Sequence, residues 1–214
     1  MLTSPGGSSL VVDSLCDHAR GQEIAVSCFY FDFAERKEQS AISMLGSLVK
    51  QMVSGMERIP EEISRAFQEQ KTTLGGCRPQ LVDIAKMLQA ITSSQPTFIC
   101  LDALDECEGV QRGRILGSLK KILEKSPGTR IFVTGRPHIR VEIDTRLAGR
   151  VIGVPVGANK DDIITYLRSR LAEDETPDAM DDTLAADILE KIPENISEMC
   201  AAAMIPETPA PFIS

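Results

Sequence analysis

The sequence predicts an α/β fold built on a mostly parallel β-sheet. Segments in which apolar residues recur every three or four positions alternate with short runs rich in β-branched and aromatic residues. This alternation is typical of domains in which helices pack on the faces of a parallel sheet. With 214 residues, 43% of them hydrophobic, the chain is long enough for one main core and a small appendage.

The first half of the chain contains mostly helical patterns around one strand. Leu10, Val11 and Leu15 share one face of the first helix, and the run IAVSCFYFDF is typical of a strand. The helix that follows the strand has the clearest apolar stripe, and a glycine pair at 75–76 ends the next one. In chain order we expect a helix over 8–19, a strand over 24–33, and helices over 39–54, 60–74 and 79–92.

The second half contains the two most apolar strands. PTFICL is a continuous apolar run, as expected for a strand that is covered on both faces, and TRIFVT is expected to be a further buried strand. The expected elements are a strand over 96–101, a helix over 110–124, a strand over 129–134, a helix over 138–147, a strand over 150–156, and helices over 161–171 and 184–192.

These patterns divide the chain into three parts. We expect an α/β core over residues 1–157 and a helical extension over 158–199, in which the acidic stretch 173–182 is a linker. Residues 200–214 contain three prolines and are expected to form a disordered tail.

Composition excludes several classes of protein. The net charge of −8 gives no electrostatic support for a broad nucleic-acid or acidic-lipid surface. The sequence contains neither a signal sequence nor the roughly 18 to 20 consecutive apolar residues of a spanning helix, so we expect a cytoplasmic protein without a membrane partner. The six cysteines include no CxxC pair and are expected to be free thiols.

Polar residues follow the two apolar strands where each strand ends. Asp102, Asp105 and Glu106 come directly after or close behind FICL, and Arg136 follows RIFVTG. Carboxyl ends of parallel strands meet at one edge of a sheet, where ligands bind. Clustered carboxylates need a compensating cation, such as Mg²⁺ on a nucleotide, and the guanidinium could pair with a phosphate or with those carboxylates. A solvated loop or a helix cap is the alternative for the acids, and a surface position is the alternative for Arg136.

The segment FICLDALDEC resembles the Walker B segment of NACHT-type signalling NTPases, especially the nephrocystin-like N-terminal variety of large fungal multidomain proteins. The strand IAVSCFYFDF, the helix EQSAISMLGSLVKQM and the sensor-like TRIFVTGRPH follow the order of that family. The resemblance covers about residues 8–199 and implies a P-loop NTPase-like three-layer fold, with the start of a small helical subdomain.

The resemblance also implies roles for individual residues. Asp102 would orient Mg²⁺ and its waters, while Asp105 and Glu106 would position or activate the hydrolytic water. Arg136 would sense or neutralise the γ-phosphate of ATP or GTP. These roles make the implied cofactors Mg²⁺ and a nucleoside triphosphate.

The phosphate-binding loop of that family departs from its pattern here. Gly6, Gly7 and Ser8 align with the final G-K-[ST], which leaves Gly7 where the phosphate lysine would be and Met1 where the first glycine would be. The strand that would precede the loop is missing, and both ends of the chain look cut. We expect this loss to weaken nucleotide binding and to leave open ladder edges beside the strand that carries Asp102.

Three hypotheses follow from the sequence. The first is a NACHT-type nucleotide-controlled assembly switch, degraded so that it hydrolyses nucleotide weakly or not at all. The second is a non-enzymatic interaction or decoy module that pairs with a full-length relative of the NACHT type through an open sheet edge. The third is a truncated gene product without an independent function.

Overall fold

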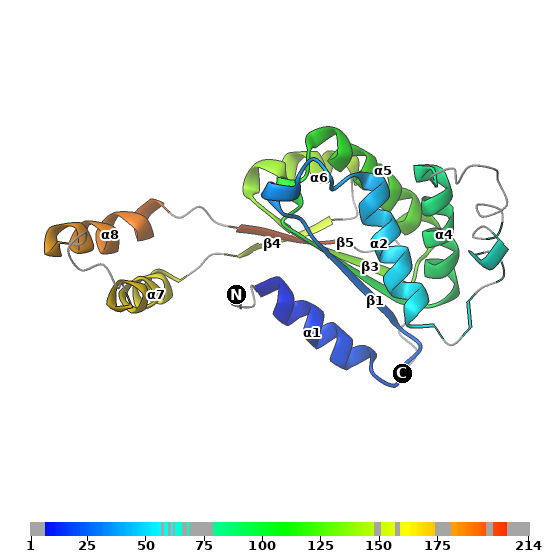
Figure 1. The fold of residues 1–214 in the computed structure, drawn as a ribbon, viewed down its shortest axis with the longest axis horizontal. Helices are drawn as coiled ribbons and strands as arrows, with labels where there is room; N and C mark the ends of the chain where they lie inside the picture. The colour runs from blue at the N-terminus through cyan, green and yellow to red at the C-terminus, as the bar shows by residue number, and fades with distance from the viewer. Residues whose placement is uncertain are drawn as a thin grey trace.

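The computed structural model shows an α/β fold with helices on both faces of a five-stranded sheet (Figure 1). The strand order is β1-β2-β3-β5-β4. The strands are β1 (Ala25–Tyr30), β2 (Thr97–Asp102), β3 (Thr129–Gly135), β4 (Val151–Val156) and β5 (Met199–Met204). The structure describes residues 7–56, 58–59, 61, 63–65, 68, 79–147, 151–156, 159–173, 181–195 and 199–204.

The helices confirm most of the predicted order. They are α1 (Gly7–Ala19), α2 (Ala41–Ser54), α4 (Leu81–Ser94), α5 (Gly109–Lys125), α6 (Arg140–Arg146), α7 (Lys160–Ala172) and α8 (Asp182–Asn195), with short 3₁₀ turns η1 (Phe33–Glu35), η2 (Leu104–Glu106) and η3 (Pro137–Ile139). Most of the helix expected over 60–74 lies outside the described residues.

The first strand is shorter than its apolar run suggested. The run continues to Phe33, but β1 ends at Tyr30. Asp32 lies at the start of η1, and its side-chain oxygen accepts a hydrogen bond from the Ala34 N–H at 2.8 Å. This local bond favours a turn over continued strand pairing.

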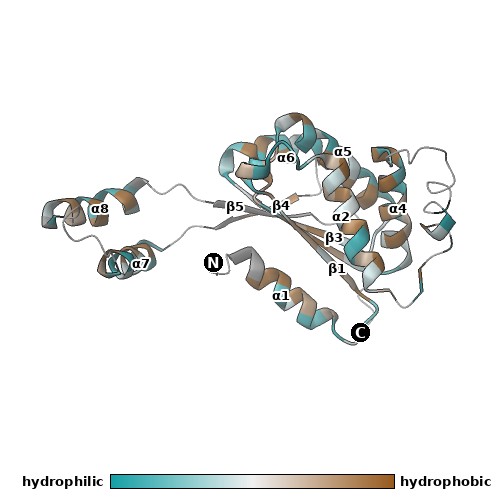
Figure 2. Ribbon diagram, viewed as in Figure 1, coloured by the Kyte–Doolittle hydropathy of each residue, from teal (hydrophilic) through white to brown (hydrophobic). Residues whose placement is uncertain are grey.

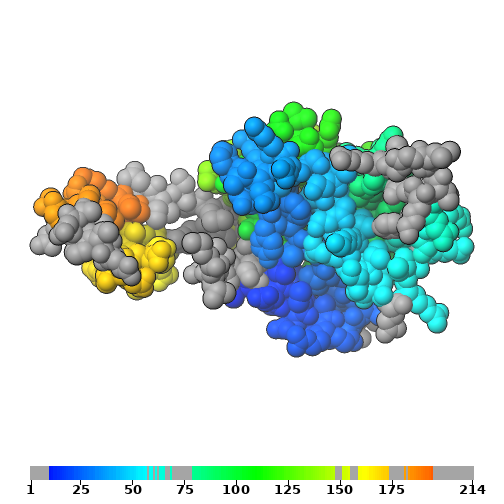
Figure 3. Space-filling view, in the orientation of Figure 1, coloured from blue at the N-terminus to red at the C-terminus, as the bar shows by residue number. Residues whose placement is uncertain are grey.

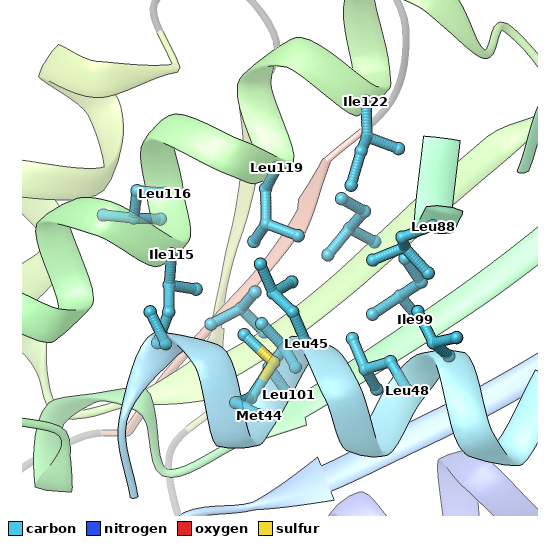
Figure 4. Packing of buried hydrophobic residues seen from close by; sticks show 14 of the residues in the cluster. Met44, Leu45, Leu48, Leu88, Ile99, Leu101, Ile115, Leu116, Leu119 and Ile122 are labelled. Carbon is cyan, nitrogen blue, oxygen red and sulfur yellow. The ribbon is translucent and has the colours of Figure 1, made fainter. Parts of the chain in front are cut away.

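The main core lies between the parallel strands and three helices. β1, β2 and β3 are parallel, with Ser27 opposite Ile99 and Ile99 opposite Ile131. Apolar residues of α2, α4 and α5 meet over one face of these strands (Figure 4). Ten of these side chains are labelled in the figure: Met44, Leu45, Leu48, Leu88, Ile99, Leu101, Ile115, Leu116, Leu119 and Ile122.

The other face of the same strands is covered by α1, which packs against β1 and β2 (Figure 1). The His18 ring of α1 meets the Phe98 ring of β2 edge-on, with 6.4 Å between centroids. Cys16, Cys28, Cys100 and Cys107 are free thiols, as expected.

The outer part of the sheet differs from the expected arrangement. β5 lies between β3 and β4 and is antiparallel to both. Residues 200–204, which the sequence placed in the disordered tail, form most of this strand. The strand that carries Asp102 has no open edge, because β2 pairs with β1 on one side and β3 on the other.

The described part of the chain contains no helix that is both long enough and apolar enough to cross a membrane.

Candidate functional site

The acidic loop begins where β2 ends. Asp102 is the last residue of β2, and Ala103 then takes up a left-handed backbone conformation with φ of 53°. For a residue with a Cβ this conformation costs about 1 kcal/mol. The Ala103 N–H donates to the Thr134 hydroxyl of β3 at 3.0 Å, which offsets part of that cost.

Thr134 connects the two strand ends. Its hydroxyl accepts from Ala103 and donates to Oδ1 of Asp102. Thr134 is buried, and the hydrogen bond fixes the direction of the Asp102 carboxylate. The sequence did not single out Thr134, although its place near the end of a buried strand was a usable signal.

Arg136 lies against the acidic loop. Its backbone N–H donates to Asp105 Oδ1 at 3.1 Å, and its Nε lies 3.4 Å from Asp105 Oδ2. Its Nη2 lies 3.2 Å from Glu106 Oε1. Of the two partners left open for this guanidinium, the structure therefore shows the carboxylates. The Asp105 side chain is 5% exposed and that of Arg136 is 67% exposed.

Gly135 allows the acidic loop after β2 to lie close to the η3 turn. A Cβ at this position would lie 2.7 Å from Ile139 Cδ1 and 3.2 Å from Asp105 Oδ1. Ile139 is buried and cannot move away freely. A side chain at 135 would therefore push η3 or the Asp105 carboxylate out of place.

Arg112 of α5 supports the acidic loop from behind. Its Nη1 donates to the carbonyl oxygen of Cys107 at 3.0 Å, and its Nε pairs with Glu142 of α6 at 2.7 Å. Both side chains of this ion pair are largely buried, so Arg112 holds the loop, α5 and α6 together. Sequence reasoning missed it because nothing in the local pattern distinguishes Arg112 from the exposed Arg114 of the same helix.

Tyr30 ends β1 directly opposite Asp102 in the parallel register. Burial raises the pKa of Tyr30 to about 12, and the neighbouring Cys28 thiol and Asp102 carboxylate add to the increase. The phenol is therefore a neutral hydrogen-bond donor across the physiological range. Its position beside the acidic loop was not predicted.

The first residues of α1 lie at the same end of the sheet. A short loop joins α1 to β1, so the two run antiparallel and the backbone of Gly7 and Ser8 lies towards the carboxyl ends of the strands (Figure 1). Free N–H groups and the helix dipole favour anions at a helix N-terminus. Gly6, the remaining residue of the expected phosphate loop, lies outside the described residues.

The site contains hard oxygen ligands but is not a complete metal centre. Among the described residues, no group of three or more histidine, cysteine or acidic side chains could hold a metal ion. Mg²⁺ typically binds one or two carboxylates and completes its shell with water and phosphate oxygens. The Asp102 carboxylate suits that kind of site, in which a nucleotide supplies the other ligands.

Fold and site together define a class: an α/β domain with three adjacent parallel strands, and with an acidic cluster and an arginine at the carboxyl ends of two of them. The model of the family described as Nephrocystin 3, N-terminal matches residues 4–136, more than half of the chain, so the chain belongs to this family. The match includes the elements from α1 to β3 and ends at Arg136. Neither a curated protein nor a solved structure matches the chain.

Proposed function

We propose that this domain binds a nucleoside triphosphate with Mg²⁺ at the carboxyl end of its parallel strands, as a NACHT-type assembly switch with weak or no hydrolysis. One observation supports the proposal: two adjacent strands bring Asp102, Asp105, Glu106 and Arg136 together at the end of the sheet where α1 begins. This arrangement suits a bound phosphate and its metal ion.

Asp102 is the residue that we assign to Mg²⁺. Thr134 donates to one of its oxygens, and Thr134 is itself held by the Ala103 N–H. A carboxylate whose rotamer is fixed in this way can orient a metal and its waters with little loss of entropy on binding. Bound Mg²⁺ would supply charge neutralisation for the phosphates.

Arg136 is the residue that we assign to the terminal phosphate. Its side chain is mostly exposed, and exposed ion pairs contribute only about 0 to 1 kcal/mol. A phosphate can therefore compete with Asp105 and Glu106 for the guanidinium, because Arg binds phosphate through charge-assisted bonds. Release from the Arg136 side chain would then leave the Glu106 carboxylate free to hold a water molecule.

Hydrolysis is expected to be poor for two reasons. Asp105 is almost fully buried and accepts a hydrogen bond from the Arg136 N–H, which restricts its access to a water. Gly7 occupies the position at which the resemblance places a phosphate lysine, and the loss of one charge-assisted contact costs about 1.5 to 3 kcal/mol. A loss of that size weakens binding by roughly ten- to a hundredfold.

The proposal is tested by titrating the full chain with fluorescent ATP and GTP analogues, with and without Mg²⁺. We expect Mg²⁺-dependent binding that Asp102→Asn weakens by about tenfold or more, since the amide keeps the Thr134 bond and loses the charge. The matched control is Asp83→Asn on the exposed surface of α4, which should bind like the unsubstituted chain. Arg136→Gln and its exposed control Arg114→Gln on α5 test the phosphate role in the same way.

Binding that is absent up to millimolar nucleotide, or unchanged in a folded Asp102→Asn variant, would refute the site. ATP hydrolysis at rates of about 1 s⁻¹ or more would refute the weak-hydrolysis part alone. Circular dichroism of each variant separates a loss of binding from a loss of fold.

A further inference from the structure

β5 joins β4 to the rest of the sheet. It pairs with β3 from Ile131 to Gly135 and with β4 along that strand's whole length. In the part of the chain that the structure describes, β4 pairs with no other strand. The position between β3 and β4 is therefore an internal strand site, occupied by a segment that returns after residues 157–198.

The sequence of β5 has a weaker intrinsic preference for strand structure than the sequence of β3, the strand with which it pairs. β5 reads MCAAAM, and alanine is depleted in strands because its small side chain packs little surface. β3 reads TRIFVTG, in which Thr, Ile, Phe and Val are strong strand formers. Backbone pairing, rather than intrinsic strand preference, therefore holds β5 in place.

α7 and α8 add little to hold β5. These two helices pack on each other (Figure 3). None of their described side chains is buried. Both carry hydrophobic residues (Figure 2), including Tyr166, 61% exposed, and Leu184, 45% exposed. We call α7, α8 and β5 the arm. The arm makes its main contacts with the rest of the molecule through the β5 ladders.

The two outer edges of the sheet are protected against a new strand. At the β1 edge, the side-chain amide of Gln51 occupies both backbone hydrogen-bonding groups of Cys28, as a neighbouring strand would. Its Oε1 accepts from the Cys28 N–H at 3.0 Å, and its Nε2 donates to the Cys28 carbonyl at 2.8 Å. In β4, Pro155 has no N–H, so this residue cannot donate a ladder bond to a strand on either side. An added strand would find the Cys28 position blocked at the β1 edge and a residue without an N–H in β4, which favours the internal site as the route for strand pairing.

We propose that two copies of this chain exchange their arms, so that β5 of each copy lies between β3 and β4 of the other. A second copy is the occupant because its β5 has, by identity of sequence, the register and backbone bonds of the internal site. Exchange forms no new type of ladder and strains no new pair, which makes it a low-cost route to a symmetric dimer. The proposal does not depend on nucleotide binding.

Exchange of the arms would change which copy supplies the strand beside the candidate functional site. Cys200 lies opposite Gly135 and Ala201 lies opposite Thr134 in the β3–β5 ladder. Thr134 holds Asp102, and Gly135 precedes Arg136. In the exchanged dimer, the strand that supports these residues comes from the other copy, so each site is completed by its partner.

The experiment uses a cross-link that only exchange can form. Pro155 lies opposite Cys200 in the β4–β5 ladder. We combine the full-length variant Pro155→Cys, Cys200→Ser with the unsubstituted chain, unfold and refold the mixture at high concentration, and oxidise it mildly. Neither chain can form a 155–200 disulfide within itself. The control mixture replaces the unsubstituted chain with Cys200→Ser.

We expect a covalent heterodimer with twice the 23.3 kDa mass of one chain, with the 155–200 disulfide identified by peptide mass spectrometry and absent from the control. Light scattering should show a concentration-dependent dimer for the unsubstituted chain. A mixture of folded chains that gives no 155–200 link, and a light-scattering mass that stays at one chain, would each overturn the proposal. If the Pro155 variant does not fold, Ile152→Cys mixed with Ala203→Cys tests another facing pair of the same ladder.

Discussion

The parallel part of the sheet and the outer part are built on different principles. In the parallel part, every strand is adjacent to helices that contribute fully buried side chains, among them Leu45, Leu88 and Leu119. In the outer part, β4 and β5 are joined by backbone ladders, and the described side chains of α7 and α8 are half-buried or exposed. Packing therefore holds the first part together, and strand pairing holds the second.

This difference places the candidate site on a boundary. Asp102 and Arg112 lie in the well-packed part, while Thr134 and Gly135 face β5 on their other side. If the arms exchange as we propose, one half of the site keeps its neighbours and the other half receives β5 of the second copy. An assembly switch needs that combination, because binding at the site must bias how another element packs.

The largest expected effect tests whether side-chain packing stabilises the parallel part of the sheet. It uses a matched pair of substitutions. Leu119→Ala removes a fully buried side chain of α5 and should reduce the free energy of unfolding by about 3 to 5 kcal/mol. Leu167→Ala on α7 removes a half-buried side chain and should cost about 1 kcal/mol or less. Urea unfolding followed by circular dichroism measures both.

If both substitutions reduced the free energy of unfolding equally, the contrast between the two parts of the sheet would be wrong, because α7 would then belong to a well-packed core of its own. A dimer in which the arm is buried by a partner would show the same signature only at high protein concentration. Measuring the pair at two concentrations therefore distinguishes an intrinsic core from a shared one.

An effect of intermediate size tests whether strand pairing holds the outer part of the sheet together. Ala202→Pro removes the N–H of a residue in the middle of β5, which faces Val133 on β3 and Gly153 on β4. A proline inside a sheet costs at least one ladder bond, or about 2 to 3 kcal/mol of local stability. Hydrogen exchange should show β4 and β5 amides losing protection while β1 and β2 amides keep theirs.

Ala202→Gly is the control for this substitution, because it removes the side chain and keeps the N–H. Loss of protection across the whole sheet in the proline variant would show that the two parts fold as one unit. Unchanged protection in β4 would show that some other contact holds that strand.

The fold of the parallel part could be predicted because its signals are local. Apolar periodicity marks α2 and α5, a continuous apolar run marks β2, and a run of strand-forming residues marks β3, so their order and approximate limits follow from the sequence. The carboxylates and Arg136 could be found for a related reason: carboxyl ends of parallel strands converge, whatever the details of packing. The family match over residues 4–136 covers this same part.

The outer part could not be predicted because its signals are not local. An alanine-rich segment before several prolines has no strand pattern, and β5 exists through pairing with strands distant in sequence. Thr134 and Arg112 were missed for a similar reason. Each acts on a loop that another strand or helix brings to it, as the Thr134–Asp102 and Arg112–Cys107 bonds show.

The smallest expected effect concerns pH and the thiols of the well-packed part. Burial raises the pKa of Cys100 to about 12 and that of Cys107 to about 11, from an ordinary value of 9.0. Both folded-state pKa values exceed the unfolded ones, so these thiols favour folding fully below pH 9 and lose that contribution as the pH rises from 9 towards 12. We expect the urea midpoint to stay level from pH 7 to 9 and to fall above it.

Thiol labelling separates this effect from general alkaline unfolding. At pH 8 the exposed Cys16 should react quickly with a thiol reagent, while Cys100 and Cys107 should react only when the chain unfolds. The alkaline fall in stability should become shallower in Cys100→Ala, because the variant has one buried thiol fewer to ionise on unfolding. If the alkaline fall in stability has the same slope in Cys100→Ala, it comes from other groups. Tyr30 is one of them, because its raised pKa acts in the same direction. Rapid labelling of Cys100 in the folded chain would show that β2 is open to solvent and would contradict the contrast between a packed and a paired half.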